Sequence, residues 1–161
     1  MLRGICKNEH FLDLLENFIL FDHSGGRTAK ILARNLQYRG VNEAVKAYEA
    51  RKLNNGKLGV FWHTQGSGKS YSMVFLAQKI RRKFAGSPTI VILTDRDELN
   101  KQISDTFENC GLLGKTKASQ FIATSGEDLV QKLKGNPSFI FTLIQKFNKA
   151  NPEPIYPDHD I

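Results

Sequence analysis

The sequence is poor in cysteine and in long apolar runs. Its two cysteines, Cys6 and Cys110, are too far apart for a metal-ligand or redox pair. This argues against a disulfide scaffold and a zinc site and favours a reducing compartment. No apolar stretch is long enough to cross a bilayer, and charges interrupt residues 1–9, where a signal peptide would have its apolar core. We therefore expect a cytoplasmic, soluble protein with no membrane partner.

The charge of the chain indicates which partners it favours, and its length limits how many domains it can form. Lysine and arginine outnumber aspartate and glutamate by 23 to 16, which gives a formal charge of +7. This balance favours a polyanionic partner such as nucleic acid, although charges spread along the chain also serve solubility. The 161 residues suffice for one globular core but not for the two stacked lobes of a complete helicase-type motor.

The part of the chain before Gly56 is expected to be mainly helical. Apolar residues recur at helical spacing over residues 8–21, and a Ser-Gly-Gly turn follows at 24–26. A second apolar face, formed by Val41, Ala44, Val45 and Tyr48, predicts another helix that ends before the break at 54–56.

After Gly56, expected strands alternate with expected helices. Short apolar runs predict buried strands at residues 58–62, 89–94, 120–124 and 139–142. Helical patterns predict helices at 73–84, at 95–107 and around 129–133. Asp95 and Glu98 are interpreted as the capping pair of the middle helix. This alternation predicts an α/β fold with a parallel sheet and helices on both faces, with ligands at the carboxyl ends of the strands.

A glycine-containing loop, Gly66-Ser67-Gly68-Lys69-Ser70, follows the first expected strand. Glycines allow backbone N–H groups to converge on phosphate oxygens, and the start of a helix favours an anion. Lys69 is expected to bridge the β- and γ-phosphates as the catalytic residue, and Ser70 to ligand Mg²⁺. The sequence therefore predicts ATP and Mg²⁺ as cofactors.

His63 stands where the usual P-loop pattern has its first glycine, so the strict pattern is not met. A lone histidine without a base, nucleophile or metal partner is expected to pack or hydrogen bond near the loop, at the end of the strand. The competing interpretation of residues 66–70 is a flexible turn between strand and helix, and the strand, loop and helix context disfavours it.

Residues 59–73, Gly-Val-Phe-Trp-His-Thr-Gln-Gly-Ser-Gly-Lys-Ser-Tyr-Ser-Met, closely resemble motif I of the motor (R) subunit of type I restriction-modification enzymes. These enzymes are superfamily 2, helicase-like DNA translocases. Trp62, His63, Thr64 and Gln65 carry the resemblance, because other P-loop proteins do not require them. It implies a partial RecA-like P-loop NTPase lobe in which Thr64 and Gln65 join residues 66–70 at the nucleotide.

Other segments resemble further motifs of the same family. Residues 93–99, followed by Gln102, resemble motif Ia, which implies that Arg96 contacts the DNA backbone; the alternative is a surface ion pair. Residues 141–147 resemble the next strand-end motif, which implies that Thr142, Gln145 and Lys146 face DNA or the ATP site. A plain strand-to-helix junction is the alternative, and both can hold.

The N-terminal part also has a counterpart in the family. Residues 33–39 are similar to the segment that recognises adenine, and a carboxamide such as that of Gln37 can both donate to and accept from an adenine edge. Residues 12–21 resemble the linker between the family's nuclease domain and its motor. The resemblance thus implies a helical linker with the adenine-recognition segment at 1–55 and an incomplete RecA-like first lobe at 56–161.

The resemblance covers most of this chain but a minority of the family's subunit. The carboxylate pair that holds Mg²⁺ for hydrolysis is not recognisable, nor is a nuclease cluster. Residues 154–157 are interpreted as a loop, so Asp158 and Asp160 cannot replace the carboxylate pair, and Ile161 is interpreted as the start of the next strand. We expect a fragment that binds ATP and DNA without completing hydrolysis.

The expected parent protein is a type I site-specific deoxyribonuclease motor subunit. The resemblance implies that it couples ATP hydrolysis to translocation and cleavage of double-stranded DNA, together with modification and specificity subunits. The alternatives are another superfamily 2 DNA helicase or translocase, a DNA-independent P-loop nucleotide-binding protein, and a remnant that binds nothing. Intact Lys69 and Ser70 argue against the remnant.

Overall fold

The computed structural model describes residues 7–147. The expectations for Cys6, for the loop at 154–157, and for Asp158, Asp160 and Ile161 concern residues outside this range. Over the described range, no helix is long and apolar enough to cross a bilayer. The chain divides by its contacts into two compact units, Met1–Phe84 and Ala85–Ile161. The predicted division after residue 55 stays a prediction.

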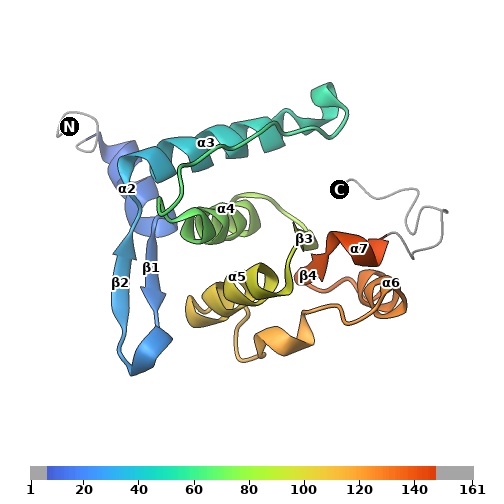
Figure 1. Cartoon of the computed structure of the whole chain (residues 1–161). Coiled ribbons are helices and arrows are strands. Elements are labelled where there is room, and N and C mark those ends of the chain that lie inside the picture. The colour runs from blue at the N-terminus through green and yellow to red at the C-terminus, as the bar shows by residue number, and fades with distance from the viewer. Residues whose placement is uncertain (1–6, 148–161) are drawn as a thin grey trace. The chain divides into compact units, whose positions relative to one another are not determined.

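The first unit combines helices with a β-hairpin (Figure 1). Its elements are α2 (Asn8–Asn17), β1 (Ile19–Asp22), η1 (Ser24–Gly26), β2 (Ala29–Leu32), α3 (Asn35–Glu49), η2 (Arg51–Asn54) and α4 (Lys69–Lys83). Strands β1 and β2 pair antiparallel, from Ile19 opposite Leu32 to Asp22 opposite Ala29.

The hairpin corrects the helix predicted over residues 8–21, because helix α2 ends at Asn17. Phe18 and Leu20 are buried, whereas Phe21 is exposed, so burial alternates along the chain as in a strand. Residues 18–21 are all aromatic or aliphatic and match a helical and a strand period over so short a run. The hydrogen bonds with β2 stabilise the strand conformation over the helical one.

Phe18 lies in the core of this unit. Its ring is 4.6 Å from that of Tyr38 on α3 and 5.7 Å from that of Phe75 on α4, centroid to centroid. Val41 and Val45 on α3 are also buried. The predicted apolar face of α3 is thus confirmed at these valines, and α3 packs against α4.

The strand predicted at residues 58–62 is absent. This segment is a loop in which Val60 is 96% and Trp62 79% exposed, and it pairs with no strand within residues 7–147. Gly59 has a φ of +110°, which an extended strand does not tolerate. A buried strand requires hydrogen-bonding neighbours on the sheet, and here Phe61 instead packs so closely on α3 that a Cβ at Gly40 would overlap its ring.

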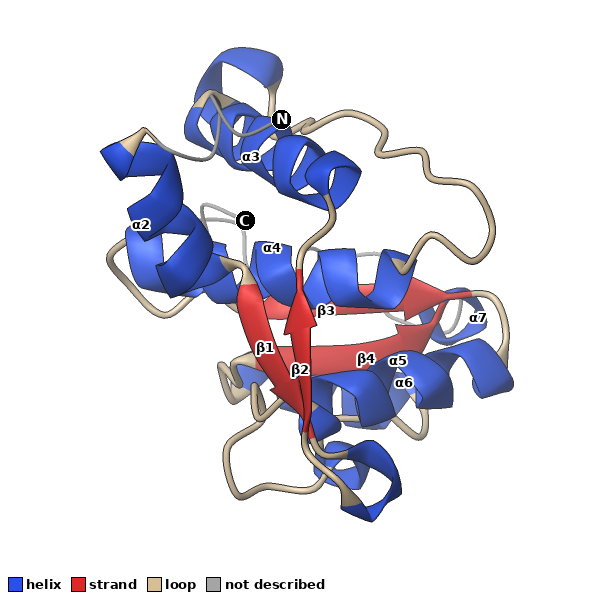
Figure 2. Cartoon of the chain, turned by 90° about the vertical axis from the view of Figure 1, so that its left-hand side faces the viewer, coloured by secondary structure: helices blue, strands red, loops and turns tan. Residues whose placement is uncertain are grey.

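The second unit contains two of the four parallel strands predicted from the sequence, those at 89–94 and 139–142. Its elements are β3 (Ile90–Thr94), α5 (Asp97–Asn109), η3 (Ala118–Gln120), α6 (Gly126–Lys134), β4 (Phe139–Leu143) and α7 (Ile144–Phe147). Strands β3 and β4 run in the same direction (Figure 2), from Ile90 beside Phe139 to Thr94 beside Leu143.

Helices cover both faces of β4, as the unbroken apolar run predicts. On one face, Phe139 and Phe141 meet Phe107 of α5, with ring centroids 5.4 and 5.3 Å apart. On the other face, Ile140 is buried with Leu129 of α6. Because successive strand residues point to opposite faces, every residue from Phe139 to Thr142 is buried.

Two details of this unit differ from the predictions. The strand expected at 120–124 is reduced to one parallel bridge between Ile122 and Phe141, because the 3₁₀ turn η3 takes up its first residue. The Asp95–Glu98 capping pair is wrong: Arg96 is the N-cap of α5 and no side chain caps the helix. Asp95 instead contacts the Arg96 guanidinium at 3.4 Å.

Candidate nucleotide-binding site

The loop between residues 63 and 68 turns into α4 through its glycines. Gly66 and Gly68 have φ values of +76° and +83°, in the left-handed region that disfavours other residues. Gly68 is the N-cap of α4. A Cβ on Gly68 would also lie 2.8 Å from the side-chain nitrogen of Gln37, so this position needs glycine for its conformation and for space.

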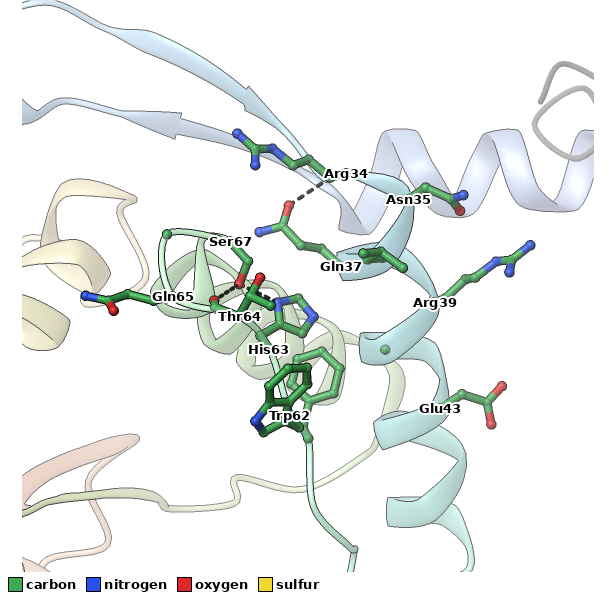
Figure 3. A pocket seen from close by; sticks show the side chains of 14 residues that line it. Arg34, Asn35, Gln37, Arg39, Glu43, Trp62, His63, Thr64, Gln65 and Ser67 are labelled. Carbon is green, nitrogen blue, oxygen red and sulfur yellow. Dashed lines mark hydrogen bonds between the residues drawn. The ribbon is translucent and has the colours of Figure 1, made fainter.

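Gln37 joins the start of α3 to this loop. Its Oε1 accepts the N–H of Arg34 at 2.8 Å (Figure 3). Its Nε2 donates to the carbonyl of Gly68 at 3.0 Å. The same carbonyl accepts the N–H of Ser72 at 3.1 Å. Gln37 is 4% exposed, so its amide holds the loop against α3 from a buried position. An adenine contact by Gln37 would use the second N–H or the remaining lone pair of its amide, or would exchange one of these bonds.

His63 hydrogen bonds within the loop, as predicted, although no strand precedes it. Its Nδ1 lies 3.0 Å from Oγ of Ser67, which donates to the Thr64 carbonyl at 2.6 Å (Figure 3). The Ser67 N–H reaches the same carbonyl at 3.3 Å. The ring of Phe61, 4.5 Å away between centroids, packs on the imidazole.

The loop and the first turn of α4 leave several donors unused. Within residues 7–147, the backbone N–H groups of Gly66, Gly68, Lys69 and Ser70 donate to no other group of the chain. Over the same range the exposed Lys69 has no carboxylate partner. N–H groups at a helix start combined with a free ammonium favour an anion, and a phosphate would satisfy both.

A pocket of about 850 Å³ adjoins this loop (Figure 3). It lies between the first half of α3 and residues 61–67, and its charged or aromatic lining includes Arg34, Arg39, Glu43 and Trp62. The arginines and Glu43 were not predicted as site residues. Arg39 and Glu43 stand four residues apart, which places them on one side of a helix, but that signal does not separate a pocket wall from an ordinary solvated helix face. Thr64 and Gln65 line the pocket, whereas Lys69 and Ser70 do not.

Helix α4, which carries the loop, contacts a carboxylate on each of two elements, the partly buried Asp13 and the buried Asp22. Tyr71 donates to Asp22 of β1 at 2.5 Å, and Lys79 contacts Asp13 of α2 at 2.5 Å. Burial alone would raise the pKa of both carboxyls. For Asp13, hydrogen bonds from Lys79 and Asn17 and the lysine charge outweigh burial and lower its pKa. For Asp22, hydrogen bonds from Tyr71 and the turn after β1 likewise lower the pKa.

The predicted DNA-contacting residues fall in the second unit, within β4 or just after β3 and β4. Arg96 follows β3 and is exposed, and Nε2 of Gln145 donates to the Asp95 carbonyl beside it at 3.1 Å. Lys146 donates to the carbonyl of Ala123. Thr142 is fully buried within β4, where it can touch no ligand in this conformation. The structure thus brings Arg96, Gln145 and Lys146 to one edge of the parallel pair.

The loop before α4 offers unused N–H donors at the start of a helix, and a comparison with known families gives the class of protein to which the chain belongs. The family model of the SWI2/SNF2 ATPases matches residues 36–161, and the chain belongs to this family. Membership in an ATPase family implies the use of a nucleotide.

Relatives narrow the family further. The chain is 39% identical to the type I restriction enzyme HindI endonuclease subunit of Haemophilus influenzae, over 98% of this chain and 15% of the relative. It is 33% identical to the putative type I restriction enzyme MjaIXP endonuclease subunit of Methanocaldococcus jannaschii, with the same coverage. The resemblance predicted from residues 59–73 is confirmed, and the chain spans about 15% of the length of these relatives.

Proposed function

We propose that the chain is the ATP-binding part of the motor of a type I restriction enzyme endonuclease subunit. In this proposal it is an incomplete first RecA-like lobe preceded by a linker, with the boundary after residue 55. The parent protein couples ATP hydrolysis to translocation and cleavage of double-stranded DNA, alongside modification and specificity subunits. The similarity to endonuclease subunits over 98% of the chain supports this assignment.

The observation that carries the nucleotide proposal is the set of unused donors at the start of α4. The N–H groups of Gly66, Gly68, Lys69 and Ser70 and the ammonium of Lys69 would bind the phosphates. The Ser70 hydroxyl would ligand the Mg²⁺ that accompanies the triphosphate. The adjoining pocket has room for the base and ribose beside Thr64 and Gln65.

Gln37 is proposed to read the adenine edge by exchanging its bond to Gly68 for a bond to the base. Replacement by alanine should then reduce the preference for ATP over GTP as well as the affinity for both. Equal loss for the two nucleotides would assign Gln37 to holding the loop and would remove its role in base recognition.

Thermal unfolding with Mg²⁺ and ATP tests the phosphate site directly. At a free ATP concentration of about 100 times Kd, binding should raise the melting temperature by about 5 to 10 °C. Lys69→Ala should abolish the shift because it removes the only side-chain charge placed on the phosphates by this proposal. Lys57→Ala, which changes another exposed lysine, before the loop, is the control and should keep the shift. An undiminished shift in the Lys69 variant would refute the phosphate site.

We further propose that the 161-residue chain binds ATP without sustained turnover, since no carboxylate pair for Mg²⁺ is recognisable in its sequence. Phosphate release that duplex DNA stimulates in this chain would contradict the proposal.

A further inference from the structure

His63 has no part in the nucleotide chemistry proposed above, yet its ring is held from two sides. The Phe61 ring packs on it at 4.5 Å between centroids, and Nδ1 faces Ser67 Oγ at 3.0 Å. Gly40 admits the Phe61 ring against α3, because a Cβ there would overlap that ring. The imidazole is therefore fixed between α3 and the turn at residues 64–67.

The hydrogen bonds of the loop assign the proton on this histidine. Ser67 has one hydroxyl proton, and it is donated to the Thr64 carbonyl at 2.6 Å. The Ser67 oxygen can then only accept from His63, so Nδ1 of the imidazole carries a hydrogen. A chain of donors runs from the histidine through the serine to the carbonyl of Thr64.

We propose that His63 is a positioning residue of the phosphate loop, which keeps the turn at residues 64–67 closed through the hydroxyl of Ser67. The closed turn is the conformation in which Gly66, Gly68, Lys69 and Ser70 keep their N–H groups without an acceptor within the described range. This inference rests on the proposed binding of ATP by the loop. Its physical basis is that a loop already held in its binding conformation loses less conformational entropy when the phosphates bind.

The same contacts permit the opposite effect, because the Ser67 N–H is occupied by the Thr64 carbonyl and would be offered to a phosphate only after the turn opens. That contact is 3.3 Å long, at the weak end of the hydrogen-bond range, so a charged phosphate oxygen can replace it easily. The geometry therefore favours positioning over obstruction, and the sign of the effect on affinity separates the two.

The test is the Kd of Mg²⁺–ATP measured by calorimetry on the 161-residue chain. His63→Ala should weaken binding about 5- to 10-fold, as expected for the loss of a hydrogen bond that orders the site. His63→Asn, which keeps a side-chain N–H donor, should recover most of the affinity. His23→Ala is the matched control, because His23 makes a similar bond to Thr28 Oγ1 at 3.0 Å in the hairpin. That control should bind as the unaltered chain does.

A double-mutant cycle with Ser67→Ala identifies the route of the effect. If His63 acts through the Ser67 hydroxyl, His63→Ala should cause no further loss once that hydroxyl is absent. Additive losses would mean that the ring acts only by packing on Phe61 and would overturn the proposal. Ser67→Ala removes the donor chain without touching the imidazole, so an unchanged Kd in that variant would overturn the proposal even if His63→Ala does not fold.

The outcomes separate this inference from the proposed function. If the unaltered chain binds no ATP, or Lys69→Ala binds as well as it, the proposed function fails. If those controls behave as expected but His63→Ala has the Kd of His23→Ala, the positioning role alone fails. Tighter binding by His63→Ala would show that the closed turn obstructs the site and would also overturn the inference.

Discussion

Among single residues, Lys79 carries a charge into the interior of the unit formed by residues 1–84. Its ammonium lies 2.5 Å from Asp13 and 2.7 Å from the Asn42 side-chain oxygen, and 5.0 Å from the centroid of the Phe18 ring. The lysine side chain is 8% exposed and that of Asp13 is 20% exposed. These contacts connect α4 to both α2 and α3. A substitution at Lys79 is therefore expected to weaken the packing of all three helices.

Lys79→Met should therefore destabilise the chain strongly. The methionine fills a similar volume but removes the lysine charge and its hydrogen bonds to Asp13 and Asn42, so that Asp13 keeps the hydrogen bond from Asn17 but loses its ion pair. The cost is about 2 to 4 kcal/mol after allowing for the partial exposure of Asp13. Lys46→Met is the control, because the 2.8 Å pair between Lys46 and Glu43 is exposed on both sides, and it should change little. The free energy of unfolding in urea measures both; equal effects would mean that the buried pair does not stabilise the fold.

The same pair predicts the response to acid. Because the pKa of Asp13 is lower in the folded chain than its ordinary value, its contribution is fully present above the ordinary aspartate pKa of about 4 and is lost as pH falls through the folded-state pKa. The pKa of Asp22 is lowered too, and it acts in the same direction. In Asp13→Asn the decline in unfolding free energy below about pH 4 should be shallower. An unchanged pH profile would contradict the assignment.

Among helices and strands, the sequence predicted correctly those whose apolar pattern matches the faces that neighbouring elements cover. Strand β4 and helices α5 and α6 match their patterns, because Phe107 and Leu129 cover the two faces on which Phe141 and Ile140 alternate. Helical period and strand period cannot be separated over the short run 18–21, which is why the hairpin was missed. The run 58–62 has the composition of a buried strand, but whether it becomes one depends on a neighbouring strand.

For the candidate site, too, the features that depend on consecutive residues were predictable from the sequence, and those that depend on packing were not. The glycines at 66 and 68 and the histidine at 63 were located from spacing, because each role depends on a few consecutive residues. The hydrogen bonds that tie Gln37 to Gly68 and the arginines at 34 and 39 along the pocket wall depend on how α3 approaches the loop. No local pattern encodes that approach.

Gly40 tests how closely α3 and the loop segment pack. In an exposed helix, replacing glycine by alanine stabilises by about 1 kcal/mol, but a Cβ here would overlap the Phe61 ring. Gly40→Ala should therefore displace Phe61 and, with it, the support of His63. Trp62 is the one tryptophan of the chain, so a displacement of the Phe61 ring beside it should change the tryptophan emission of the protein.

The companion variant is Phe61→Ala, which removes the ring that the new methyl group would meet. In that background Gly40→Ala should regain the stabilisation expected from helix propensity. If Gly40→Ala stabilises the unaltered chain and leaves the Trp62 emission unchanged, the close approach of α3 to residue 61 is absent in solution.

At the scale of the whole molecule, the net charge of +7 gives any contact with DNA a measurable signature. Lysines and arginines that neutralise phosphates release counterions, so the logarithm of the binding constant falls linearly with the logarithm of salt concentration. If only the net charge mattered, all exposed lysines and arginines would contribute similarly to this salt dependence. The proposed motor instead concentrates it where Arg96 and Lys146 follow β3 and β4.

Arg96→Ala should therefore lower the salt slope of duplex DNA binding by about 0.9 if the guanidinium contacts one phosphate. Its exposed 3.4 Å contact with Asp95 is too weak to prevent this, because exposed ion pairs contribute at most about 1 kcal/mol. Lys30→Ala removes the same charge from an exposed position on β2 and should leave the slope nearly unchanged. Equal slopes in the two variants would mean that DNA senses only the net charge, and the proposed contact edge after β3 and β4 would have to be given up.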